Sequence, residues 1–163
     1  MLSENVEKIL NKQIADEAYS SRLYLAMAVW CDHSSLSGAA HFFYHQSDEE
    51  RGHMKRIIQY VNRVGGRVVI SDTKGPPVEY KSLKDVIEEA YEHEKSMTVA
   101  IVKLVDTSLE KKDYATFDFL QWFVTEQVEE EAMLKSLLDR FNLVGTDAHG
   151  TFIMDKEMGS REA

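Results

Sequence analysis

The sequence predicts an all-α protein, folded as a four-helix bundle with one long crossover between its second and third helices. Apolar residues recur at spacings of three and four through residues 4–64 and 83–143, which is the helical period. The only two prolines, Pro76 and Pro77, stand together in the glycine-containing segment between these halves. At 163 residues the chain is long enough for one domain with a sizeable core, so we expect residues 1–163 to form a single domain.

Each half of the chain divides into two long helices. The first half breaks near "DHSSLSG" and the second near "LEKKDYAT", both rich in residues that end helices. Because these links are short, the two helices of each half should be antiparallel neighbours. Three terminal signals support the bounds: the capping-box spacing of Ser82 and Asp85 before the third helix, Asp113 as N-cap of the fourth, and Gly145 after it.

The segment between the two halves must run the length of the bundle. Helices of about 30 residues span about 45 Å, and about 17 extended residues at about 3.3 Å each can cover that distance. The "RVVI" run at residues 67–70 should therefore cross in extended form. The bundle should end near residue 143. A short apolar run then predicts a fifth helix over about 150–158, carried by Phe152, Ile153, Met154 and Met158.

Charge and the N-terminus limit the partners and the location. The 19 basic and 28 acidic residues leave a formal charge of −9, which repels phosphate backbones and anionic lipids and favours cations. We expect neither nucleic acid nor a membrane as partner. The start "MLSENVEKIL" lacks the features of a secretion signal. Together with a single cysteine, Cys31, this indicates a cytoplasmic protein.

The apolar face of every long helix is interrupted by polar side chains near its middle. Taken singly, a glutamate in such a stripe usually reaches solvent, and a lone histidine is usually a hydrogen-bonded core residue. Four helices with interruptions at the same height are harder to explain in that way. The interruptions are Glu17 in the first helix, Gln46, Glu50 and His53 in the second, Glu94 in the third, and Gln127 and Glu130 in the fourth.

Buried carboxylates need protons, basic partners or metal ions, because an isolated carboxylate is costly in an apolar interior. No lysine or arginine lies in phase on the four inward faces at this height. The four glutamates and His53 therefore form a hard, oxygen-rich ligand set of the kind that holds paired iron or manganese ions. The spacing of Glu50 and His53 lets both address one metal from adjacent turns.

Three further features have a structural and a functional interpretation. Tyr24 follows Glu17 by two turns on the same face. It is either a core aromatic residue, or a hydrogen-bond donor to a ligand carboxylate and a source of an electron. For Trp122, which lies about a turn before the site, the favoured interpretation is packing. A second acidic group, formed by Glu49, Glu126 and Glu129, lies beside the inward ligands. It is interpreted either as a solvated acidic face or as a third cation position. The other histidines lack a comparable spacing and receive no role: His33, His41, His45, His93 and His149.

These motifs resemble the ferroxidase centre of the ferritins, specifically the prokaryotic non-haem ferritins. The likeness covers essentially the whole chain, and its motifs are Glu17…Tyr24, Glu50-x-x-His53, Glu94 and Glu126-Gln127-x-Glu129-Glu130. It implies a cytoplasmic iron-storage protein that forms a hollow homo-oligomeric cage of 24 subunits. Each bundle would oxidise Fe(II) with dioxygen or peroxide, and ferric mineral would collect in the cavity.

The resemblance also implies individual roles. Glu17, Glu50 and His53 would hold the first iron, and Glu50 would bridge to a second. The expected catalytic residues are Glu17, Tyr24, Glu50, His53, Glu94, Gln127 and Glu130, with Glu94 and Glu130 on the second iron and Gln127 close to it. The third iron position would be formed by Glu49, Glu126, Glu129 and Glu130.

Two departures separate this chain from neighbouring branches. Bacterioferritins and many di-iron oxidases repeat Glu-x-x-His on the fourth helix, where this chain has Gln127-x-x-Glu130. With one bridge and one histidine fewer, the second iron should be held more weakly, as suits a centre that passes ions onward. Arg51 stands where bacterioferritins have the haem-ligating methionine, so no haem is expected.

Two other functions stay open at the level of sequence. A small soluble di-iron or di-manganese oxidase or peroxidase would retain its metal and make no mineral. A helical interaction protein with solvated carboxylates would bind no iron tightly and gain no stability from metal.

Overall fold

The computed structural model describes residues 2–161, which form five helices and no strand. The predicted all-α bundle with one long crossover is confirmed. The fourth helix ends one residue after the expected bundle limit of 143, and the fifth is two residues longer at each end than expected. The helices are α1 (Glu4–His33), α2 (Ser37–Arg63), α3 (Leu83–Glu110), α4 (Tyr114–Val144) and α5 (Ala148–Ser160).

The helices begin and end where local chemistry favours it. The Ser82 hydroxyl accepts a hydrogen bond from the Asp85 amide at the start of α3, and the Asp113 carboxylate accepts one from the Thr116 amide at the start of α4. Gly145 follows α4 with a φ of 86°, a conformation that glycine adopts without strain. The caps expected at Ser82 and Asp113 are therefore present.

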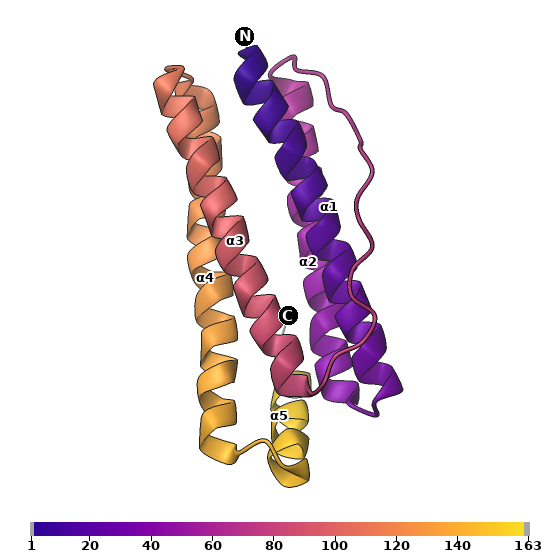
Figure 1. The fold of residues 1–163 in the computed structure, drawn as a ribbon. Coiled ribbons are helices and arrows are strands. Elements are labelled where there is room, and N and C mark those ends of the chain that lie inside the picture. Colours follow the sequence, from indigo (N-terminus) through magenta and orange to yellow (C-terminus); the bar gives the residue numbers. More distant parts are fainter. Residues whose placement is uncertain (1, 162–163) are drawn as a thin grey trace.

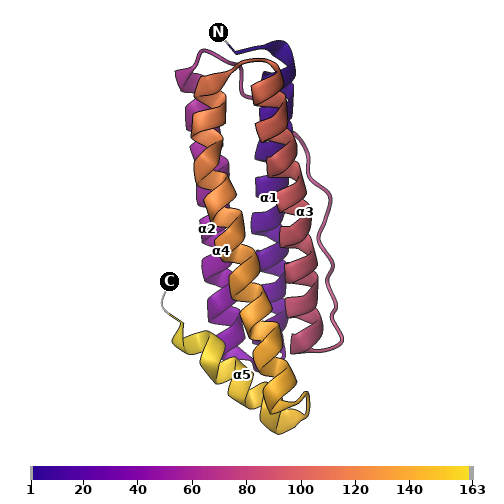
Figure 2. The ribbon, with the colours of Figure 1, turned by 90° about the vertical axis from the view of Figure 1, so that its left-hand side faces the viewer.

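The four long helices form two antiparallel pairs joined by the crossover. Figures 1 and 2 show α1 beside α2 and α3 beside α4, with residues 64–82 running along the bundle next to α1. Side chains of α1 hold this extended segment. The Asn11 amide nitrogen donates to the Arg67 carbonyl at 2.9 Å, and its oxygen accepts from the Val69 amide at 2.7 Å. The Arg67 amide also donates to Glu7 Oε2 at 3.0 Å, so the start of the "RVVI" run is held by side chains of α1 rather than by a second strand.

Helix α5 closes one end of the bundle against α2 (Figure 2). Its contact needs glycine, because a Cβ on Gly38 would lie 2.0 Å from the Asp155 carbonyl oxygen. The Asp155 carboxylate accepts a hydrogen bond of 2.8 Å from the Ala39 amide. Leu36, which precedes α2, makes no side-chain cap. The N-terminus of α2 is therefore capped by a residue more than a hundred positions later in the chain.

The buried interior consists of two apolar clusters with polar residues between them. The cluster at the α5 end includes Tyr24, Phe43 and Leu134, and the other includes Leu10 and Phe123. The mid-height carboxylates thus lie in an interior sealed at both ends by apolar packing.

Among residues 2–161, no helix contains a stretch that is long and apolar enough to cross a lipid bilayer.

Candidate metal centre

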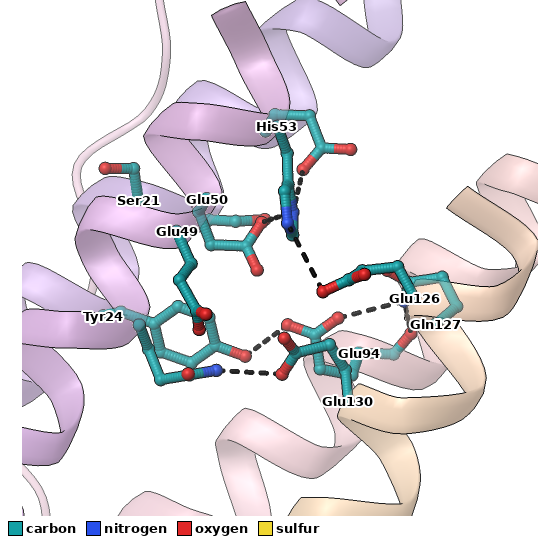
Figure 3. A network of polar contacts seen from close by, with 12 residues as sticks. Ser21, Tyr24, Glu49, Glu50, His53, Glu94, Glu126, Gln127 and Glu130 are labelled. Atoms are coloured by element: carbon teal, nitrogen blue, oxygen red, sulfur yellow. Dashed lines mark hydrogen bonds and ion pairs between the residues drawn. The ribbon is translucent and has the colours of Figure 1, made fainter. Parts of the chain in front are cut away.

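Glu17, Glu50 and His53 meet between α1 and α2. One ligand atom from each lies within 4.8 Å of the others. The Nδ1 atom of His53 is 3.3 Å from Glu50 Oε2 and 3.9 Å from Glu17 Oε2. All three side chains are buried. Glu50 and His53 lie one turn apart on α2, and Figure 3 shows both side chains pointing into the site.

Glu94 lies on the opposite side of the site and is held from two helices. The Tyr24 hydroxyl on α1 donates a hydrogen bond to Glu94 Oε1, and the Gln127 amide on α4 donates one of 3.0 Å to Glu94 Oε2 (Figure 3). Tyr24 also stacks on Phe43, with ring centroids 5.9 Å apart. The ring of Tyr24 therefore packs in the core and its hydroxyl contacts a candidate ligand, while its role as an electron source stays a prediction.

Glutamine side chains orient two of the remaining carboxylates. Gln46 donates a hydrogen bond of 2.8 Å to Glu130, and Gln13 donates one of 2.9 Å to Glu17. Sequence reasoning placed Gln46 on the inward face without a role and did not consider Gln13. Gln46 lies one helical turn before the candidate ligand Glu50, and Gln13 lies one turn before Glu17. A search for amide side chains at this spacing could have found both.

Burial dominates the electrostatics of the carboxylates. Desolvation raises the pKa of Glu17, Glu50 and Glu94. The charge of Glu50 raises the pKa of Glu17 further, and the charge of Glu94 raises that of Glu50. The pKa of Glu130 rises to about 8, through desolvation first and then through Glu94 and Glu49. Within residues 2–161, no lysine or arginine lies in ion-pair distance of these four carboxylates. Protons or a bound cation must therefore balance these carboxylates.

The arrangement fits a bound metal ion. Glu50 Oε1 is buried and has no hydrogen-bond partner among the described residues. A buried acceptor without a partner is costly unless a cation satisfies it. The donor set of carboxylate oxygens and one imidazole nitrogen suits iron, manganese and zinc. Glu50 has neighbours on two sides, since it shares a hydrogen bond with Glu17 and the charge of Glu94 raises its pKa.

The second acidic group borders a cavity next to this site. A cavity of about 430 Å³ between α2 and α4 is lined by Glu49, Glu126, Glu129 and Glu130 among others. Glu126 Oε1 lies 3.8 Å from His53 Nε2, whereas Glu129 is exposed. His41 and His45 also line this cavity.

Two aromatic contacts support the site from outside. Trp122 lies edge-on to His53, with ring centroids 5.3 Å apart, in agreement with its expected packing role. His93, which received no role from the sequence, accepts or donates a hydrogen bond of 2.7 Å with Ser20 and contacts the Tyr24 ring edge-on. Burial lowers the pKa of His93 to about 4, so this imidazole is neutral at ordinary pH.

Comparisons with known proteins identify the family of this chain. The family model described as a ferritin-like domain matches residues 7–144. The chain is 49% identical over 160 residues to a probable bacterial non-heme ferritin-like protein of Haemophilus influenzae, covering 98% of this chain and 97% of that one. It is 44% identical over 156 residues to the bacterial non-heme ferritin of Campylobacter jejuni, covering 96% and 93%.

A solved structure extends the likeness to three dimensions. The open pore ferritin of the archaeon Archaeoglobus fulgidus superposes with a TM-score of 0.96 at 38% identity, covering 99% of this chain and 100% of that one. The family model matches most of the chain, the relatives align over nearly their whole length, and carboxylates are buried at mid-height. These findings lead to one conclusion. This chain belongs to the ferritin family.

Proposed function

We propose that this protein stores iron and oxidises Fe(II) inside each four-helix bundle. The observation that carries the proposal is Glu50 Oε1, a buried carboxylate oxygen without a hydrogen-bond partner in the described part of the chain. Three further buried glutamates surround it, and none has a lysine or arginine partner among residues 2–161. Membership of the ferritin family supports iron as the cation. Iron is here a substrate and a cargo rather than a resident cofactor.

Each side chain has a distinct task in this proposal. Glu17, Glu50 and His53 bind one Fe(II), and Glu94 and Glu130 bind a second, with Glu50 between the two ions. Tyr24 and Gln127 orient Glu94 through their hydrogen bonds. Glu130, with its pKa raised to about 8, gives up a proton as the second ion binds. The hydrogen bonds of Tyr24 and Gln127 hold the Glu94 carboxylate in position before an ion binds.

Two Fe(II) ions held side by side can give two electrons to one molecule of dioxygen or peroxide. Carboxylates stabilise Fe(III) more than Fe(II) because the higher charge interacts more strongly with anionic oxygen ligands. The protein contributes position and charge, and the oxidant is the co-substrate. Glu49, Glu126, Glu129 and Glu130 would hold a third iron at the neighbouring cavity, which carries four carboxylates.

Storage also requires assembly and a place for mineral. We infer a cytoplasmic homo-oligomeric cage of 24 subunits, supported by the likeness of the whole subunit to the ferritin of Archaeoglobus fulgidus. Several apolar side chains are exposed on the single subunit and offer surface for contacts between subunits, among them Ile70, Val78 and Leu143.

One experiment separates storage from its alternatives. Excess Fe(II) is added in air, and size-exclusion chromatography is followed for iron and protein. Iron far above three ions per chain, eluting with a large particle, supports storage. A small species with only the site iron would indicate an oxidase without mineral, and no bound iron would indicate an interaction protein.

The variants Glu50→Ala and Glu130→Ala test the site itself. Both should abolish fast iron oxidation while the helical circular dichroism stays unchanged. Normal iron oxidation in either variant would overturn the assignment of the site.

A further inference from the structure

Two residue pairs on facing helices form one hydrogen-bonded group at the edge of the candidate metal centre. Glu94 and Thr98 lie one turn apart on α3, and Gln127 and Glu131 lie one turn apart on α4. Glu94 and Gln127 are buried and bonded to each other (Figure 3). Thr98 and Glu131 are half-buried and extend the group outward from the centre.

The Thr98 hydroxyl has two acceptors within reach but only one hydrogen to donate. Its oxygen lies 2.5 Å from Glu131 Oε1 and 3.1 Å from the backbone carbonyl oxygen of Glu94. The carboxylate is the stronger acceptor, because hydrogen bonds to charged groups are stronger than bonds between neutral groups. The hydroxyl hydrogen therefore points at Glu131, and the lone pairs of Thr98 Oγ1 are left to accept.

The side-chain amide of Gln127 donates to those lone pairs. Its nitrogen lies 3.3 Å from Thr98 Oγ1, and it lies 3.0 Å from Oε2 and 3.2 Å from the carbonyl oxygen of Glu94. All three neighbours act as acceptors, so they attract the amide nitrogen and would repel the amide oxygen. Thr98 belongs to this set of acceptors because Glu131 takes its hydrogen.

No basic side chain competes for the Glu131 carboxylate. Among residues 2–161, no lysine, arginine or histidine lies within ion-pair distance of it, and the Lys95 ammonium pairs with Glu92 at 2.6 Å instead. Without the Glu131 carboxylate, the Thr98 hydroxyl would turn its hydrogen to the Glu94 carbonyl oxygen. It would then compete with the amide for that acceptor rather than hold the amide in place.

We propose that Glu131 is a positioning residue for iron oxidation that acts through Thr98 and Gln127. Glu131 makes the Thr98 hydroxyl an acceptor, and this acceptor keeps the nitrogen of the Gln127 amide turned toward α3. The amide in turn holds one oxygen of the Glu94 carboxylate. The effect on the rate rests on the proposed function. The orientation of the amide does not, because it is a property of the iron-free chain.

Stopped-flow measurement of iron oxidation tests the order of these contacts. Glu131→Ala and Thr98→Val should each slow oxidation about tenfold, the smaller end of the effect of removing a group that supports a ligand. Because both act through one amide, the double variant should be no slower than the slower single variant. Independent effects would multiply to about a hundredfold. That result, or wild-type rates in both single variants, would overturn the proposal.

Two further variants separate positioning from general damage to α3. Thr98→Ser keeps the hydroxyl and should restore most of the wild-type rate. Thr107→Val removes a hydroxyl that donates to the Lys103 carbonyl within the same helix, and it should oxidise iron normally. Melting temperatures are measured on the same samples. A Thr98→Ser rate as low as that of Thr98→Val would assign Thr98 to packing and overturn the role of its hydroxyl.

Crystal structures of the iron-free Glu131→Ala and Thr98→Val variants give a readout that does not depend on iron. We expect the Gln127 amide to have rotated, with its 3.0 Å contact to Glu94 Oε2 lost. An unchanged contact in both variants would overturn the positioning role and leave the proposed function intact. Conversely, a lost contact together with normal iron oxidation by Glu50→Ala would remove the proposed function and keep the positioning of the amide.

Discussion

The side-chain amide of Gln46 on α2 donates a hydrogen bond of 2.8 Å to Glu130 on α4. This bond joins the two helices at the height of the buried carboxylates. It also occupies one Glu130 oxygen and leaves the other for the acidic cavity that this residue lines. Gln46 is therefore a positioning residue for a candidate ligand, because it acts on the carboxylate and not on the metal.

Replacing Gln46 tests that role. The Gln46→Ala variant frees the Glu130 carboxylate to rotate, so we expect weaker binding of the second Fe(II) and iron oxidation slowed about tenfold, in the range that loss of a hydrogen-bonded support to a ligand produces. Stopped-flow absorbance at increasing Fe(II) measures the effect. The control Gln59→Ala, on the exposed part of the same helix, should oxidise iron as fast as the wild type. Equal rates in both variants would assign Gln46 to packing alone.

Tyr24 can be divided into its two parts by one substitution. The Tyr24→Phe variant keeps the ring that stacks on Phe43 and loses the hydroxyl that donates to Glu94. The melting temperature should change little, while iron oxidation slows because Glu94 then has Gln127 as its one remaining side-chain donor. Rate and melting temperature are measured on the same preparation. A large drop in melting temperature with a normal rate would show that the hydroxyl serves the fold.

The raised pKa of Glu130 predicts a pH dependence of stability without metal. The folded chain keeps this proton up to about pH 8, whereas an unfolded glutamate loses it near 4.3. The folded state thus binds more protons between these values, so its free energy of unfolding falls as pH rises through that window. Glu17, Glu50 and Glu94 shift in the same direction.

Calorimetry of the iron-free protein at pH 5, 6, 7 and 8 checks this sign. The melting temperature should fall toward pH 8, and it should fall less in the Glu130→Gln variant, whose amide does not titrate. Scans at one fixed heating rate keep irreversible unfolding comparable between samples. Parallel curves for the wild type and the variant would contradict the assignment of the raised pKa to Glu130.

The contact between α5 and α2 predicts a stability effect without an effect on chemistry. The Asp155→Ala variant removes the acceptor for the Ala39 amide, and loss of an N-cap costs about 1 kcal/mol. The melting temperature should fall by several degrees, and the Asp155→Asn variant should recover most of the loss because its amide oxygen can still accept the bond. Iron oxidation should be normal in both variants. An unchanged melting temperature in Asp155→Ala would show that water caps α2 equally well.

Much of the bundle and of its centre follows from spacing along single helices. The breaks near residues 32–38 and 109–116, the caps at Ser82 and Asp113, and the fifth helix all agree with the structure. The mid-height residues Glu17, Glu50 and Glu94 are buried as the periodicity predicts. Their roles as iron ligands remain a proposal, for which the titrations and variants above are the tests.

Contacts between helices could not be derived in the same way. Nothing near Glu130 in the sequence indicates that Gln46, 84 positions earlier, donates to it. The same holds for Asp155, which caps α2, and for the Ser20 hydroxyl against His93. Such pairs depend on how far each helix is rotated about its axis and shifted along it, and many registers satisfy the same apolar pattern.

By itself, the sequence determined which stretches are helical, which faces turn inward and which polar residues interrupt those faces, because each property repeats with the period of one helix. The tertiary structure alone decided which of these residues meet. It placed Gln127 on Glu94 and brought His41, His45 and the α4 glutamates to one cavity. Within residues 2–161, it also left Glu50 Oε1 without a hydrogen-bond partner. The physical reason is that close packing of apolar side chains from all helices sets the register, and the polar contacts at mid-height follow from that register.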